Sequence, residues 1–147
     1  MTTYRLMTMD DYDEVYDLWL HTPGMGLNAV LDSREGIEKY LLRNPSTTFV
    51  AEEEGRIVGV MMAGHDGRRG MIHHTAVRES HRGRGVGSEL LKRVMAAMDE
   101  EGILKVALVA FSSNEGGNAF WEKAGFHVRE DLVYRDKALR PFKQIRT

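Results

Sequence analysis

The stretch Val77–Leu91, VRESHRGRGVGSELL, organises this chain. An apolar run from Met71 to Val77 leads into it and is typical of a buried strand. After the glycine-rich part, apolar residues recur at Val86, Leu90, Leu91, Val94, Met95 and Met98. This spacing predicts a long helix with one apolar face. The sequence therefore predicts a buried strand and a buried helix joined by a short loop that contains glycines and arginines.

The loop between the predicted strand and helix has the composition of an anion-binding site. Glycines at positions 83, 85 and 87 allow backbone angles that other residues avoid and let a ligand approach the main chain. The free N–H groups of the loop and of the first helical turn, together with the helix dipole, favour negative charge here. Arg82 and Arg84 add positive charges with bidentate geometry. The pattern suits a pyrophosphate, because a single carboxylate would leave donors unused.

The loop has other interpretations. It could be only a tight turn from strand to helix, although a bland turn rarely adds two arginines before a helix. It could hold a dinucleotide or a nucleoside triphosphate, but its glycines are spaced G-x-G-x-G and not G-x-G-x-x-G, and no Gly-Lys-Ser/Thr follows. Both common nucleotide motifs are therefore absent.

Two motifs, in order along the chain, resemble those of the GNAT acetyltransferase superfamily. The residues from Arg82 to Gly87 resemble its R/Q-x-x-G-x-G/A signature. Asn114, followed by AFWEKAGF from Ala119 to Phe126, is similar to its later motif, an Asn followed by a helix that ends in Y-E-K-x-G-F. One helix and one strand separate the two motifs, as in the family. The resemblance is strong over residues 47–128 and looser elsewhere.

The resemblance implies an α/β (α+β) GNAT fold. The sheet is expected to be mixed, mostly antiparallel and twisted, with about six to seven strands flanked by about four helices. A parallel strand pair that splays apart would leave a cleft for the pantetheine arm of acetyl-CoA. We expect a single domain over residues 1–147, in which residues 140–147 are a solvated, partly frayed tail.

Hydrophobic periodicity and turn residues outline the elements. Strands are expected at residues 4–7, 47–52, 57–63, 71–77 and 105–111, helices at 12–20, 32–43, 86 to about 100, and 118–123, and a closing hairpin at 126–128 and 132–139. Capping-box patterns at residues 8–11 and 32–35 begin the first two helices. Short turns predict an antiparallel meander from 47 to 77, and the crossover helix predicts that strands 71–77 and 105–111 are parallel.

The composition excludes several classes of protein. The chain has 147 residues, a net charge of −2 and no cysteine. Disulfides, thiolate metal sites and a cysteine nucleophile are excluded, and no general basic field favours nucleic acid as a partner. No apolar run approaches the roughly 20 residues of a membrane span, and the N-terminus does not resemble a signal peptide. We therefore expect a cytoplasmic protein.

The resemblance also implies acetyl-CoA as the cosubstrate and assigns residues to it. Its phosphates would be held by the N–H groups of Arg82, Gly83, Arg84, Gly85, Val86, Gly87 and Ser88. The pantetheine arm would lie beside the strand end at Ala76 and Val77, where the N–H of Val77 or its neighbour would stabilise the oxyanion. Asn114 matches the family position whose side chain meets this arm. Trp121 is also expected to contact the cofactor.

Acetyl transfer also requires a base that takes a proton from the acceptor amine. If side chains alternate along the strand, Met71, His73, Thr75 and Val77 share one face, and only His73 among them is ionisable near neutral pH. In the GNAT family that this chain resembles, members that acetylate arylalkylamines have histidines at the positions of Met71 and His73, and others have a glutamate at the position of Met71. His73 is therefore the candidate base, and the alternative is a hydrogen-bonded histidine without proton transfer. His74 is expected to point the other way, so no metal site is predicted.

Trp121 departs from the family pattern, which usually has a tyrosine there to protonate the leaving sulfur. An indole N–H donates a hydrogen bond but no proton at a useful pH. Tyr134 is the candidate replacement, unless the thiolate leaves unaided. Val109 stands where relatives that acetylate peptide N-termini carry a glutamate, which disfavours a ribosomal protein as the acceptor without excluding it.

The favoured function is an acetyl-CoA-dependent N-acetyltransferase that moves the acetyl group to a primary amine of a small molecule or peptide by direct transfer in a ternary complex. Trp121 motivates the alternative of a catalytically weak or inactive acetyl-CoA-binding module that acts as a sensor or interaction protein. A general nucleotide-binding regulator rests on the glycine loop alone. The loop at residues 21–32 is expected to shape the acceptor pocket, and edge strands near the C-terminus could pair in a homodimer.

Overall fold

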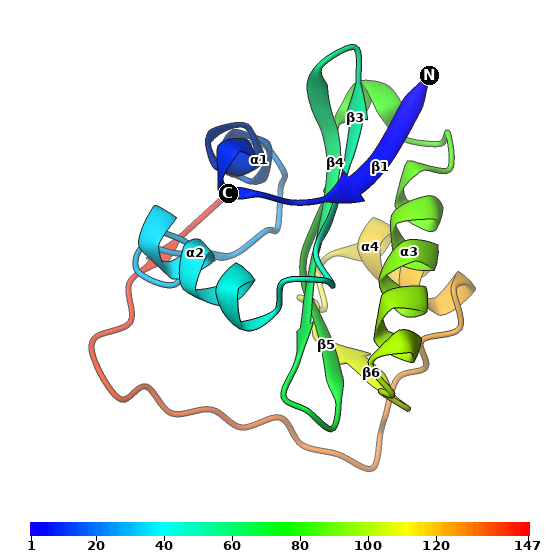
Figure 1. The fold of residues 1–147 in the computed structure, drawn as a ribbon. Coiled ribbons are helices and arrows are strands. Elements are labelled where there is room, and N and C mark those ends of the chain that lie inside the picture. The colour runs from blue at the N-terminus through cyan, green and yellow to red at the C-terminus, as the bar shows by residue number, and fades with distance from the viewer.

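The centre of the fold is a five-stranded sheet, shown in Figure 1 for the computed structural model of residues 1–147. Across the sheet the strands are β1 (Thr2–Leu6), β3 (Phe49–Glu53), β4 (Arg56–His65), β5 (Gly70–Val77) and β6 (Val106–Leu108). The first four pair antiparallel and only β5 and β6 are parallel. The predicted mixed sheet with a meander and one parallel pair is confirmed.

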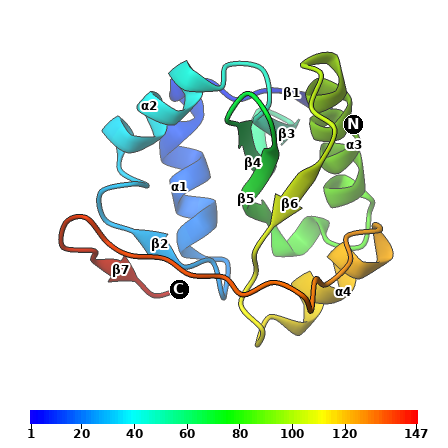
Figure 2. The ribbon, with the colours of Figure 1, turned by 90° about the horizontal axis from the view of Figure 1, so that it is seen from below.

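Two helices cover each face of the sheet, as the view from below in Figure 2 shows. Helices α1 (Tyr12–Leu20) and α2 (Arg34–Arg43) lie on one face, and α3 (Val86–Glu100) and α4 (Glu115–Lys123) lie on the other. Two short 3-10 turns, Met9–Asp11 and Glu79–His81, precede α1 and the glycine loop. The helix apolar faces bury two separate cores, one between α1 and the sheet and one between α3 and the sheet.

The helix ends follow local sequence signals. The hydroxyl of Ser33 accepts a hydrogen bond from the N–H of Gly36 at 3.1 Å and so caps α2. Before α1, the Asp11 carboxylate accepts from the N–H of Thr8 at 2.9 Å. After α3, Gly102 has a φ of 76°, which L side chains rarely adopt. The capping box at residues 8–11 and the stop signal are confirmed, whereas α2 begins at Arg34 with Ser33 as its cap and not with the predicted box at residues 32–35.

A β-bulge in β5 changes the predicted arrangement of its side chains. Thr75 lies opposite Met61 and Ile72 lies opposite Ala63, so a step of three residues on β5 matches a step of two on β4. The two residues between, 73 and 74, thus face one residue of the neighbouring strand. The alternation of side chains between the two faces is interrupted at this point.

The bulge places both histidines on the face covered by α1 and α2. The ring of His74 packs edge-on against Trp19 of α1 at 4.9 Å, and the ring of His73 packs against Tyr40 of α2 at 5.6 Å. Val77, by contrast, packs against the α3 core. The predictions that His73 shares a face with Val77 and that His74 points away from His73 are therefore wrong, because strict alternation does not survive a bulge.

The parallel pairing of β5 and β6 is short. Gly70, Met71 and Ile72 pair with β6, and the pairing ends there. The predicted strand over residues 105–111 is thus reduced to Val106–Leu108, after which the chain turns away toward α4. From His73 onward β5 has no neighbour on that side, which opens the expected cleft at the strand ends.

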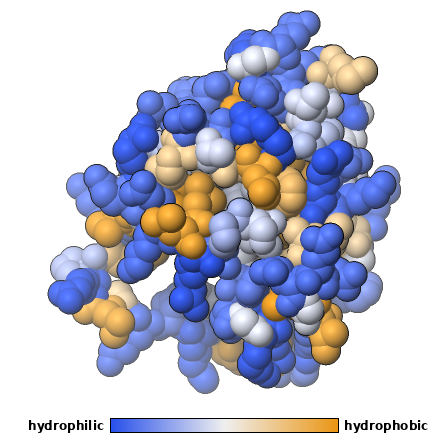
Figure 3. Space-filling view, in the orientation of Figure 1, coloured by the Kyte–Doolittle hydropathy of each residue, from blue (hydrophilic) through white to orange (hydrophobic).

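The C-terminal region differs from the predicted closing hairpin. Residues 126–143 contain no helix or strand, and their apolar side chains are exposed, as for Val133 (74%) and Leu139 (96%). Without a face to bury, pairing would not offset the entropy lost on ordering. The main sheet therefore has five strands and not six or seven. In Figure 1 this segment runs from beside α4 along the bottom to the left, and in Figure 3, in the same orientation, its left part stands away from the body.

The C-terminal residues are partly ordered by strand pairing, where a frayed tail over residues 140–147 was expected. Strand β7 (Gln144–Ile145) pairs antiparallel with β2 (Leu27–Asn28) in a separate two-stranded sheet. The carbonyl of Lys143 accepts from the N–H of Ala29 at 3.0 Å, which extends the ladder by one bond. The tail thus returns to the loop between α1 and α2 (Figure 2). No helix has the length and apolar character needed to cross a bilayer.

Candidate active site

Two adjoining pockets lie along the open edge of β5. One of about 580 Å³ borders the glycine loop, and one of about 450 Å³ borders the two histidines. Both are lined by Thr22, Pro23, Thr75, Asn114 and Trp121. The shared residues join the pockets into one cleft. No Asp or Glu side chain lines either pocket, so the cleft suits an anion at the loop end.

The glycine loop presents main-chain donors to the larger pocket. Gly83 and Gly85 have φ angles of 76° and 82°, and a Cβ at either position would meet open space. The N–H groups of Gly83, Arg84 and Gly85 donate no hydrogen bond within the chain, and α3 begins directly after them. Free N–H groups at the start of a fifteen-residue helix have the geometry and partial charge that suit an anion.

The third glycine of the loop serves packing. A Cβ on Gly87 would lie 3.2 Å from the ring of Phe120, so α3 and α4 approach closely only because this side chain is absent. Arg82 lines the larger pocket, with its Nε donating to the carbonyl of Val77 at 3.0 Å. Arg84 does not line the pocket. Of the two arginines predicted to meet phosphate, the structure brings Arg82 to the cleft.

Most of the other predicted cofactor residues line the larger pocket. Ala76, Val77, Val86, Gly87 and Ser88 do so, together with Asn114 and Trp121. The side chain of Asn114 also accepts from the N–H of Gly117 at 3.0 Å and so caps α4. Trp121 is 9% exposed and packs edge-on against Phe120 and Phe126. Both residues stand where the two pockets meet.

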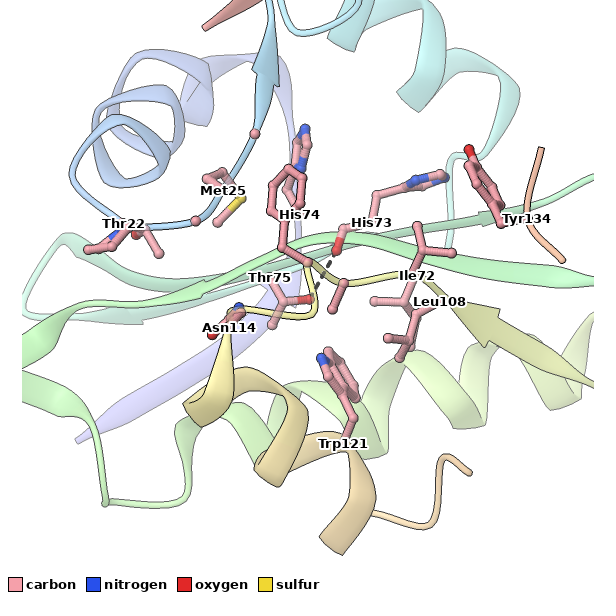
Figure 4. A pocket seen from close by; sticks show the side chains of 16 residues that line it. Thr22, Met25, Ile72, His73, His74, Thr75, Leu108, Asn114, Trp121 and Tyr134 are labelled. Atoms are coloured by element: carbon pink, nitrogen blue, oxygen red, sulfur yellow. Dashed lines mark hydrogen bonds between the residues drawn. The ribbon is translucent and has the colours of Figure 1, made fainter. Parts of the chain in front are cut away.

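The smaller pocket has apolar walls and two histidines, shown in Figure 4. Its apolar lining includes Met25 from the loop after α1, Ile72 from β5, and Leu108 and Phe111 from β6 and the chain after it. His73 and His74 rise from β5 on the side away from Trp121 (Figure 4). The expectation that the loop at residues 21–32 shapes this pocket agrees with its lining.

Tyr134 lines the smaller pocket, but its ring is 69% exposed. In Figure 4 it lies on the opposite side of β5 from Trp121. The hydroxyl predicted to replace the usual acid is thus in the cleft and on the side of the histidines. Its role in proton transfer stays a prediction.

The two histidines have different surroundings. The Nε2 of His74 lies 2.9 Å from Oδ1 of Asp32, whose carboxylate is almost fully buried. His73 has no side-chain hydrogen bond. Desolvation beside Tyr40, reinforced by the positive charge of a protonated His74, lowers the pKa of His73, and Asp32 acts in the opposite direction. A lowered pKa keeps His73 neutral near pH 7.

Sequence reasoning missed several residues of the cleft. Phe120 lines the larger pocket and was not among the predicted residues, and Thr22, Pro23 and Asp32 belong to the predicted loop at residues 21–32 but were not singled out. In the sequence, Asp32 belongs to a capping pattern and to the end of this loop, and neither pattern indicates a contact with a histidine. No spacing in the sequence connects it with β5, because the contact joins residues 42 positions apart.

The residues present fit acetyl-CoA. Unpaired main-chain donors at the start of α3 match a diphosphate, and the open edge of β5 beside Ala76 and Val77 leaves room for an extended amide-containing arm. When bound there, the molecule would supply an acetyl thioester at the junction of the two pockets.

The chain belongs to the GNAT acetyltransferase family, because the family model described as "Acetyltransferase (GNAT) family" matches residues 12–126. An acetyltransferase of Photorhabdus laumondii is 32% identical over 90% of this chain and 86% of its own length. The chain is accordingly an N-acetyltransferase, and the family implies acetyl-CoA as the donor.

Solved structures show the same fold. Ard1 from Thermoplasma volcanium superposes with a TM-score of 0.75 at 23% identity, covering 87% of this chain and 84% of that protein. The PaiA N-acetyltransferase from Thermoplasma acidophilum, solved with coenzyme A, has a TM-score of 0.75 at 15% identity and covers 88% and 92%. At these identities the likeness concerns the fold.

Proposed function

We propose that this enzyme moves the acetyl group of acetyl-CoA directly to a primary amine of a small molecule or peptide within a ternary complex. The observation that supports this most is the junction of the two pockets at Thr75, Asn114 and Trp121. A thioester that enters along the larger pocket and an amine that enters through the smaller one would meet there, so no acyl-enzyme is needed.

On the donor side, the chain would act mainly through its backbone. The N–H groups from Gly83 to Ser88 would hold the diphosphate, and the side chain of Asn114 would contact the pantetheine arm. The N–H of Arg78 already donates to the carbonyl of Val58 at 2.7 Å. The N–H of Val77 is therefore a better candidate than that of its neighbour Arg78 for stabilising the oxyanion.

On the acceptor side, the pocket favours an amine attached to an apolar body. Its walls include Met25, Phe111 and Tyr134, and no carboxylate lines it to hold a second ammonium group. A polyamine would keep at least one charge without a partner there, which is costly in a partly desolvated pocket. We therefore favour a monoamine with an aromatic or aliphatic body, or the N-terminus of an apolar peptide.

Gly85→Glu tests the donor site. We expect acetyl-CoA to raise the melting temperature of the wild-type protein by several degrees, as about a hundredfold excess over Kd gives, and the variant to lose this rise. Gly67→Glu is the matched control, because Gly67 also has a positive φ and open space around its Cα but lies in the β4–β5 turn. Equal acetyl-CoA shifts in both variants would refute the proposed site.

A second candidate is an acetyl-CoA-binding module with little activity, which the indole at Trp121 favours. Thiol release from acetyl-CoA should be followed with 2-phenylethylamine, spermidine and a peptide with a free apolar N-terminus. We expect release to depend on the amine and to be strongest with 2-phenylethylamine or the peptide. An acetyl-CoA shift without amine-dependent release would favour the module.

A further inference from the structure

A buried carboxylate stands behind the acceptor pocket. The side chain of Asp32 is 6% exposed and lies in the loop before α2. Its Oδ2 accepts from the N–H of Asn28 at 2.8 Å, and the hydroxyl of Tyr12 donates to its main-chain carbonyl at 2.6 Å. These bonds hold the carboxylate in one place. A buried carboxylate held in this way requires a partner for its second oxygen.

That partner is His74. Its Nε2 lies 2.9 Å from Oδ1 of Asp32, and its ring packs edge-on against Trp19. Because an ionised carboxylate only accepts hydrogen bonds, Nε2 carries the proton of the neutral ring and Nδ1 carries the lone pair. No hydrogen bond within the chain uses Nδ1. The ring is still 18% exposed and lines the acceptor pocket.

We infer that His74 and Asp32 form a catalytic dyad in which His74 takes the proton of the acceptor amine and Asp32 holds the imidazole in the required tautomer and orientation. This inference rests on the proposed function and assigns its base. His74 lies on the same face of β5 as Ala76, which belongs to the α1 core, and the β-bulge adds His73 to that face.

The proton balance of the step is simple. Nδ1 of His74 takes one proton from R–NH3⁺ and later releases it to solvent. The lone pair of the freed amine forms the C–N bond to the thioester carbonyl carbon, and the C–S bond breaks with its electron pair on sulfur. A second proton leaves the nitrogen and reaches the thiolate, so the products are an amide, a free thiol and one proton in solution.

His73 is the competing candidate, and its surroundings differ in one decisive respect. Both histidines line the pocket, but no carboxylate contacts His73 and its ring rests against Tyr40. Nothing fixes its tautomer, and protonation would place its charge beside His74. Asp32 contacts His74, His73 is its neighbour on the same strand, and Tyr134 lines the same pocket. Only Asp32 among them is an anion at neutral pH, so it stabilises the imidazolium that forms.

The first experiment compares single variants with the amine that gives the fastest thiol release. His74→Gln and His74→Ala should lower kcat by about a hundredfold with little change in the KM for acetyl-CoA. His73→Gln should lower kcat only a few-fold. Added imidazole should restore part of the activity of His74→Ala. His65→Gln is the matched control, because His65 pairs with Glu101 at 3.2 Å far from the cleft.

Asp32→Asn tests positioning. The amide can still accept from Asn28, but its NH2 group would face Nε2 and favour the opposite tautomer. We expect kcat to fall by at least about tenfold. The acidic limb of kcat against pH should move to lower pH, because the imidazolium loses its counter-charge. Asp32→Glu should recover part of the activity. If the contact between His74 and Asp32 were purely structural, Asp32→Asn would change the melting temperature and leave the acidic limb of kcat against pH unchanged.

A second experiment needs no acceptor. NMR of nitrogen-labelled histidine in the acetyl-CoA complex should show the neutral ring of His74 protonated at Nε2, and Asp32→Asn should reverse this. An Nδ1–H tautomer in the wild-type protein would overturn the dyad. So would full activity of a folded His74→Gln, with an unchanged acetyl-CoA melting shift, or a larger loss in His73→Gln. Thiol release with none of the amines would count against the proposed function, while the NMR result would still decide the dyad.

Discussion

The two ends of the cleft are built in different ways. At the donor end, consecutive residues of one loop supply main-chain N–H groups, and glycine conformation decides their direction. At the acceptor end, side chains from β5, the loop after α1 and the C-terminal segment meet through tertiary contacts. The donor end therefore depends on backbone geometry, and the acceptor end depends on which side chains the fold brings together. Substitutions at the two ends should have separable effects.

The largest effect on acetyl-CoA affinity is expected where the close approach of α3 and α4 beside the glycine loop is blocked. Gly87→Val would press on the ring of Phe120, which already lies 3.2 Å from a Cβ at this position. We expect acetyl-CoA affinity to fall at least about tenfold, which is about 1.4 kcal/mol, as measured by titration calorimetry. Phe120→Ala in the same chain should recover part of the loss. Unchanged affinity in Gly87→Val would show that acetyl-CoA binding does not need the close approach of α3 and α4.

The two helix caps offer a matched pair of intermediate effect. Asn114→Ala and Ser33→Ala each remove a side chain that caps a helix. Each should lower the free energy of unfolding by about 1 kcal/mol in urea titrations. Only Asn114→Ala should also raise the KM for acetyl-CoA, because Asn114 lines both pockets. A similar KM in both variants would assign Asn114 to capping alone.

Removing the last eight residues should affect the acceptor end selectively. Truncation after residue 139 deletes β7 and the main-chain contact between Lys143 and Ala29. Without that partner strand the loop at residues 22–28 should become more mobile. We expect a several-fold increase in the KM for the amine and an unchanged melting shift with acetyl-CoA. An unchanged KM for the amine together with a smaller acetyl-CoA melting shift would place the chain end at the donor site.

The smallest effect concerns pH and stability. Because the pKa of His73 is lowered from its usual 6.5 in the folded protein, the unfolded state binds more protons between the two values. Stability should therefore fall as pH drops through about 6.5 and level off below the folded pKa. In urea titrations from about pH 7.5 to about pH 5.5, His73→Gln should show a weaker fall than the wild type. An equal fall would mean that other groups cause it.

Local signals explain what could be predicted. The glycine loop, the apolar face of α3 and the capping box before α1 depend on residues close in sequence, and the structure has them where they were expected, while α2 starts two residues later than predicted. The later motif at Asn114 and Trp121 also lies on a helix beside the cleft. All the predicted cofactor residues except Arg84 line the larger pocket, and their binding of acetyl-CoA stays a prediction.

The amino-acid sequence by itself determined the order of the elements from β3 to α4, the turn conformations that need glycine and the glycine-rich start of α3, because each depends on neighbours within a few residues. Only the tertiary structure decided the bulge that places both histidines on one face, the contact of His74 with Asp32, the early end of β6 and the pairing of β7 with β2. These features depend on register between distant strands, where a shift of one residue reverses the face of every side chain after it.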